Sequence, residues 1–172
     1  MKLHMMAAVS FVLFAGSAAA DEQMVPLAQS GDWAAIAHRP SMTAVPDVCV
    51  AINVRSRVAF WSDGGTVEIR ISDSKWSLPT HVDGSIEIVI GDWKTIQTIS
   101  GNEASMVTAV LDEDTYPAMF AAMDKASSMA VTVGKAKPIN VSLAGSSRVT
   151  NAFRTCAGIT GGDLKGGENP FK

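Results

Sequence analysis

Residues 139–156 read INVSLAGSSRVTNAFRTC, and this stretch combines two periodicities that together decide the fold. Its first residues alternate apolar and polar side chains, which is typical of a strand with one buried face. Beyond Ser146 the apolar residues recur at helical spacing. Gly145 with Ser146 supplies a bend and an N-cap, and Gly158 is a suitable helix stop. The sequence therefore predicts a strand, a turn and a closing helix whose apolar face carries Cys156.

The rest of the chain consists mostly of short alternating segments separated by turns, which indicates a mainly β, α+β domain. Strand candidates are residues 48–54, 58–61, 66–71, 84–90, 94–99, 106–111 and 129–133, with residues 33–37 as either a short strand or a turn. A helix is predicted after the acidic residues 112–114, with Pro117 in its first turn. This spacing favours an antiparallel β-sandwich or a curled sheet of about seven strands, with one inserted helix and a C-terminal helix.

Two of the strand candidates have nearly the same sequence. GTVEIRI begins at Gly65 and GSIEIVI begins at Gly84, and each follows a turn that contains Asp and Gly. We interpret them as two similarly shaped strands of one sheet, with an internal duplication as the alternative.

The chain begins with the features of an export signal. Residues 1–20 contain a lysine near the start, a short apolar run and a small-residue cleavage site, which is typical of a secretory signal peptide. We expect residues 21–31 to be a flexible lead-in, residues 32–159 a single β-rich domain and residues 160–172 a disordered tail. The predicted location is the periplasm, with secretion as an alternative, and no membrane span is expected after signal removal.

The chain has two cysteines, Cys49 and Cys156. An even count in an oxidising compartment favours a disulfide between them. Cys49 shares a strand face with the small residues Ala51 and Asn53, which leaves room for a disulfide partner. Two buried free thiols, or a thiol that reacts or binds a metal, are the alternatives.

Three groups of residues could carry chemistry, and each also has an ordinary structural explanation. Ser72 and Lys75 match S-x-x-K, in which a lysine one helical turn away activates a serine, but we expect them in a turn between strands. Residues 112–114 offer carboxylates to a calcium ion, yet they also suit the start of a helix. His38 and His81 lie too far apart in sequence to suggest a zinc site. The sequence predicts no catalytic residue, no metal site and no cofactor.

The tryptophans Trp33, Trp61, Trp76 and Trp93 are the candidates for a binding surface. An indole ring presents a large flat apolar surface with one hydrogen-bond donor, which suits a sugar or peptide groove. Packing in the core or at its rim is the alternative.

The C-terminal part of the chain resembles the invasion associated locus B family of small exported bacterial proteins. The resembling residues, 107–153, give a strand, an Asp-led helix, a second strand, and S-L-x-G before a terminal amphipathic helix. Trp33 and Cys49 add weaker matches upstream. The resemblance implies a β-rich, non-enzymatic periplasmic or secreted protein, which the family links to host-cell entry and virulence.

Charge narrows the class of partner. With 14 basic and 17 acidic residues the formal net charge is −3, and no basic stripe indicates binding to nucleic acid or anionic lipid. Because no active-site constellation is found and the C-terminal part resembles the family named above, we predict a non-catalytic periplasmic or secreted protein that acts through a protein partner in the envelope or the host. The alternative is a periplasmic binding module or enzyme inhibitor that recognises a peptide or an envelope glycan.

Overall fold

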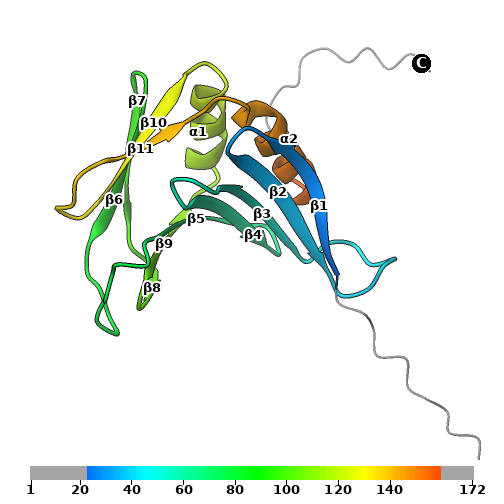
Figure 1. Cartoon of the computed structure of the whole chain (residues 1–172), viewed down its shortest axis with the longest axis horizontal. Helices are drawn as coiled ribbons and strands as arrows, with labels where there is room; N and C mark the ends of the chain where they lie inside the picture. Colours follow the sequence, from blue (N-terminus) through cyan, green and yellow to red (C-terminus); the bar gives the residue numbers. More distant parts are fainter. Residues whose placement is uncertain (1–22, 160–172) are drawn as a thin grey trace, which may run out of the picture.

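The computed structural model describes residues 23–159, which form eleven strands and two helices. The strands build two antiparallel sheets, and both helices lie on the side where the sheets face each other (Figure 1). The predicted mainly β class, with one inserted helix and one C-terminal helix, is confirmed, although the strands outnumber the seven or so expected. The predicted signal peptide and the predicted tail, residues 160–172, lie outside the described residues.

The large sheet has seven strands in the order β1-β2-β3-β4-β5-β9-β8. Strands β1 to β5 form a meander of consecutive antiparallel neighbours, and β9 returns to pair with β5. Their bounds are β1 Gln23–Ser30, β2 Trp33–Arg39, β3 Val48–Asn53, β4 Val58–Asp63, β5 Thr66–Ser72, β8 Gly101–Glu103 and β9 Met106–Leu111.

The small sheet has four strands in the order β11-β10-β6-β7. Their bounds are β6 Ser85–Ile90, β7 Trp93–Thr98, β10 Ser128–Val133 and β11 Ile139–Ser142. The two similar segments, GTVEIRI and GSIEIVI, are β5 and β6, so they belong to different sheets and our placement of them in one sheet was wrong. Their alternation requires one buried face each, and both sheets offer such a face to the same core.

One core lies between the two sheets and the two helices. Helix α1 (Thr115–Met123) buries Met119, Phe120 and Met123, and helix α2 (Ser146–Cys156) buries Val149 and Phe153 among its residues. A row of four aromatic rings crosses the core from β2 through β4 and α1 to α2, with successive centroids 6.2, 5.2 and 6.0 Å apart. These rings belong to Trp33, Phe60, Phe120 and Phe153, and they connect the large sheet to both helices.

The predicted disulfide is confirmed. Cys49 in β3 is bonded to Cys156 at the end of α2, across a sequence separation of 107 residues, with the two Cα atoms 6.0 Å apart. Cys49, Ala51 and Asn53 share the buried face of β3, as the sequence predicts, and small side chains there let the helix approach the sheet closely.

The expected lead-in is the main error in domain organisation. Residues 23–30 form strand β1, which pairs with β2 along nearly its whole length. A shift in register between Pro26 and Ala28 breaks the alternation, and the strand lies at the edge of the sheet, so its sequence lacks the pattern of a buried strand. The short strand β8 was not predicted, because it lies between the strand candidates 94–99 and 106–111, where the sequence indicates a connecting turn.

The start of the closing helix also differs from the prediction. Gly145 occupies the N-cap position with φ +83°, and no side chain caps the helix. Ser146 is instead the first helical residue and is buried. The turn packs so closely on the β1–β2 hairpin that a Cβ on Gly145 would lie 2.8 Å from the carbonyl oxygen of Ser30. Glycine is therefore needed at this position both for its positive φ and for this close backbone contact.

Candidate functional site

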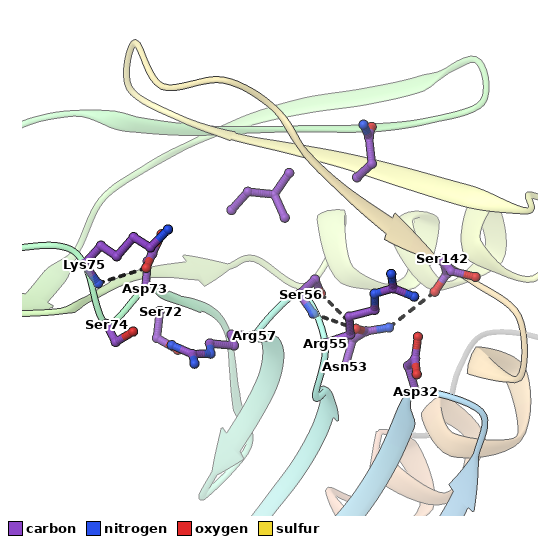
Figure 2. Close-up of a pocket in the computed structure, with 12 residues that line it drawn as sticks. Asp32, Asn53, Arg55, Ser56, Arg57, Ser72, Asp73, Ser74, Lys75 and Ser142 are labelled. Atoms are coloured by element: carbon purple, nitrogen blue, oxygen red, sulfur yellow. Dashed lines mark hydrogen bonds between the residues drawn. The ribbon is translucent and has the colours of Figure 1, made fainter.

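An open cavity of about 610 Å³ lies between the large sheet and strand β11 of the small sheet (Figure 2). It is lined by Asp32 from the β1–β2 turn, four residues at the β3–β4 turn, four residues at the end of β5 and in the loop that follows, and three residues of β11. Its volume falls within the range of roughly 300–1,000 Å³ that is common for ligand sites. We name it the inter-sheet cleft.

Asn53 builds the floor of the inter-sheet cleft. This buried residue ends β3, and its side-chain oxygen accepts hydrogen bonds from the backbone N–H and the hydroxyl of Ser56, both at 3.0 Å. The N–H of Arg57 donates to the Asn53 carbonyl at 2.8 Å, which closes the turn. Arg57 has φ +58°, a conformation that a side chain rarely adopts and that these bonds hold in place. The turn thereby presents Arg55 and Arg57 at the surface.

Two hydrogen bonds fix the position of β11 relative to the large sheet. The indole N–H of Trp33 donates to the carbonyl oxygen of Ser142 at 2.8 Å, and the side-chain amide of Asn53 donates to the same oxygen at 3.4 Å. One wall of the cleft is therefore attached to the other at the Ser142 end.

The loop after β5 forms the opposite end of the cleft. The N–H of Lys75 donates to the Asp73 carboxylate at 2.9 Å, and the N–H of Trp76 donates to the Asp73 carbonyl at 3.0 Å, so these residues make a tight turn. Ser72 and Lys75 both line the cleft, but the segment between them is not helical. Among the described residues, no hydrogen bond joins their side chains.

Three cationic side chains give the cleft its chemistry. Arg55, Arg57 and Lys75 are exposed, and none of these side chains makes a hydrogen bond or ion pair within residues 23–159. The opposing acids are Asp32 and Asp73, and the Asp73 carboxylate already accepts the backbone N–H of Lys75. Figure 2 shows the Arg55 side chain rising from the β3–β4 turn toward β11, and Arg57 extending toward the loop of Ser72. Guanidinium and ammonium groups in this arrangement are suited to a carboxylate.

Most residues of this site carry no functional signal in the sequence. Ser72 and Lys75 match a catalytic motif, whereas the two arginines and the residues of β11 are not predicted as site residues. The signal available was Arg-Ser-Arg directly after a buried strand, where a turn must present two like charges together. No such signal marks Ser142, because its position next to Asn53 depends on how the two sheets pack against each other.

The tryptophans do not form one binding surface. Trp33 is fully buried and stacks on Phe60, so its assignment to a surface was wrong. Trp61 lies on the other face of the large sheet, where the guanidinium of Arg70 lies 3.8 Å from the ring centroid. Trp76 and Trp93 are half-buried and pack against the core from the β5–β6 loop and from β7. The rim-packing alternative describes them better than the groove.

The remaining candidates have local structural roles. His38 lies 2.6 Å from the carboxylate of Asp47, and this hydrogen bond holds the pKa of Asp47 below its usual value. Asp112 accepts the N–H of Thr115 at the start of α1 at 2.6 Å, and hydrogen bonding from Thr115 likewise lowers the pKa of Asp112. In the part of the chain that the structure describes, no cluster of three histidine, cysteine or acidic side chains could hold a metal ion. No helix between residues 23 and 159 has the length and apolar character needed to cross a membrane.

Comparison with known proteins leaves the family open. No family model and no curated protein sequence matches the chain. Among solved structures, the chain is similar to the crystal structure of invasion associated protein B from Bartonella henselae, with a TM-score of 0.44 and 18% identity over 74% of this chain and 95% of that chain. This is a weak likeness, so the resemblance to the invasion associated locus B family stays a prediction.

Proposed function

We propose that the protein is an exported, non-catalytic binding protein that recognises a carboxylate-bearing ligand in the inter-sheet cleft. The observation that carries the proposal is the group formed by Arg55, Arg57 and Lys75, whose side chains have no ion-pair partner within residues 23–159. Such a group attracts a complementary anion and discriminates against cations. Export is supported by the disulfide, which forms in oxidising compartments.

A preformed frame favours binding over a flexible surface contact. The β3–β4 turn is held by Asn53, and β11 is held by Trp33 and Asn53, so the two walls are ordered before a ligand arrives. Binding then costs less conformational entropy than it would at a mobile loop.

The absence of activity is part of the proposal. A catalytic serine needs a base within hydrogen-bond reach, and in the described residues the Ser72 hydroxyl has no such bond to Lys75. Asp73 instead organises the turn through its bonds to Lys75 and Trp76. Hydrolysis of chromogenic esters or peptides by the purified protein that is lost in Ser72→Ala would overturn this part.

The binding test uses two acidic polymers of different chemical class, the polypeptide polyglutamate and the glycan oligogalacturonate. Neutral dextran is the negative control. We expect one or both acidic polymers to bind in calorimetry at low salt and to bind more weakly as salt rises, because exposed charges are screened. The variant R55E/R57E should bind at least about tenfold more weakly, since it loses charge-assisted hydrogen bonds and gains repulsion.

The matched control reverses charge elsewhere. Arg148 on α2 and Lys125 just after α1 are both exposed, and neither lines the inter-sheet cleft. The variant R148E/K125E therefore changes the net charge by the same amount as R55E/R57E and should leave binding nearly unchanged. Equal loss in both variants, or no binding of either acidic polymer to the wild-type protein, would contradict the proposal.

A further inference from the structure

Strand β11 is an open edge of the small sheet. It pairs with β10 on one side only, in antiparallel register with Met129 opposite Val141 and Val131 opposite Ile139. The N–H of Leu143 donates to the carbonyl of Ser127, and this bond identifies which residues of β11 direct their backbone groups toward β10. These groups alternate in direction along an antiparallel pair, so the backbone N–H and carbonyl groups of Ile139, Val141 and Leu143 point toward β10.

The intervening residues, Asn140 and Ser142, therefore direct their backbone groups toward the inter-sheet cleft. The hydrogen bonds from Trp33 and Asn53 to the Ser142 carbonyl agree with this direction. Three backbone groups of this edge remain without a bond in the described structure: the N–H and carbonyl of Asn140 and the N–H of Ser142. Asn140 is exposed and lines the cleft.

Positive charge surrounds this edge. Arg55, Arg57 and Lys75 line the cleft beside it, and Lys135 and Lys137 are exposed in the turn that leads from β10 into β11. An unpaired strand edge offers donors and acceptors at the spacing of a polypeptide backbone, which a sugar chain does not reproduce.

We infer that the ligand of the inter-sheet cleft is an extended acidic segment of a partner polypeptide, which adds to the small sheet as a short strand beside β11. This inference rests on the proposed function and names its ligand class. The backbone of the segment pairs with Asn140 and Ser142, and its Asp or Glu side chains reach Arg55, Arg57 and Lys75. The four-residue length of β11 limits the added strand to a few residues.

The first test leaves the protein unchanged. A short blocked peptide in which glutamate and valine alternate is titrated into the wild-type protein, together with two versions that are N-methylated on every glutamate or on every valine. The N–H groups of a strand alternate between its two edges, so only one of the two methylated peptides should lose affinity, by about fivefold to tenfold or more. Equal affinity of all three peptides, or equal loss in both methylated ones, would overturn the inference.

The second test changes the edge itself. Asn140→Pro removes the N–H that faces the cleft and keeps the bonds to β10, since proline is tolerated at an edge position. Asn140→Thr is the matched control, because it changes the same side chain and keeps the N–H. We expect the peptide to bind Asn140→Pro about fivefold to tenfold more weakly than Asn140→Thr. Equal affinity for the two variants would overturn the inference.

Amide hydrogen exchange adds a readout that does not depend on variants. Peptide binding should slow exchange at Asn140 and Ser142 but leave Val141 unchanged, because the N–H of Val141 already faces β10. Unchanged exchange at Asn140 in the presence of bound peptide would overturn the inference.

The outcomes separate this inference from the proposed function. If oligogalacturonate binds through Arg55 and Arg57 while the acidic peptide does not bind, the ligand is an anionic glycan; the inference then fails and the proposed function stands. If neither the glycan nor the acidic peptide binds, both the proposed function and this inference fail.

Discussion

The indole N–H of Trp33 and the carbonyl oxygen of Ser142 are joined by a hydrogen bond of 2.8 Å, although the two residues lie 109 positions apart in the chain. Trp33 begins β2 of the large sheet and Ser142 ends β11 of the small sheet. This bond links the sheets directly, and together with the amide of Asn53 it fixes one end of the inter-sheet cleft. Trp33, which the sequence offered as part of a tryptophan binding surface, is instead a core residue that holds one end of the inter-sheet cleft in place.

Trp33→Phe should lower the free energy of unfolding by about 1–3 kcal/mol, because it leaves the Ser142 carbonyl with only the longer bond from Asn53 and removes part of a fully buried ring. Urea denaturation measures the effect. Trp93→Phe is the control: its indole is half-buried and makes no hydrogen bond in the described residues, so the loss there should be smaller. Equal losses would contradict a special role for the Ser142 bond.

The double variant Cys49→Ala/Cys156→Ala should have a free energy of unfolding about 2–5 kcal/mol lower than the wild type, because the disulfide closes a long loop and constrains the unfolded chain. Alanine suits position 49, which already lies among small residues on β3. A reducing agent should lower the unfolding midpoint of the wild-type protein to that of the double variant and leave the variant unaffected. An unchanged wild-type midpoint after verified reduction would refute this prediction.

Gly145→Ala should destabilise the protein more than Gly134→Ala. Both glycines have positive φ, +83° and +54°, and alanine in this region costs about 1–2 kcal/mol at either site. At Gly145 the new methyl group also meets Ser30, whereas nothing lies within 4 Å at Gly134, so a further cost of about 1–3 kcal/mol is expected. The unfolding midpoints of the two variants, measured by thermal unfolding, test this prediction. Equal destabilisation would contradict it and show that Ser30 moves aside to accommodate the methyl group.

Asp112→Ala should destabilise helix α1 in a pH-dependent way. Hydrogen bonding from Thr115 lowers the pKa of Asp112 below 3.8, so the ionised carboxylate stabilises the folded state above that pH. The stabilisation is lost as the pH falls through the lowered pKa. The difference in unfolding midpoint between wild type and Asp112→Ala should therefore be full at pH 7 and shrink below pH 3.8. Glu113→Ala removes a neighbouring exposed carboxylate and serves as the control; a pH-independent difference for Asp112→Ala would contradict the assignment.

Local patterns predicted a large part of this fold. The alternation in residues 66–71 and 106–111 correctly assigns β5 and β9, and the helical spacing after Ser146 correctly assigns α2. These predictions hold because burial of one face imposes a period that is visible within a few residues. The period does not show which strands pair with each other, so the same pattern in β5 and β6 gave no indication that they belong to different sheets.

The sequence by itself determined the mainly β class, the disulfide partners and the faces that most strands bury. Tertiary structure decided that the chain forms two sheets, that residues 23–30 complete the large one, and that the β3–β4 turn lies opposite β11. The physical reason is the range of the interactions. Periodicity and capping act within a few residues, whereas the cleft depends on bonds such as that from Asn53 to Ser142, which exist only after distant strands have packed together.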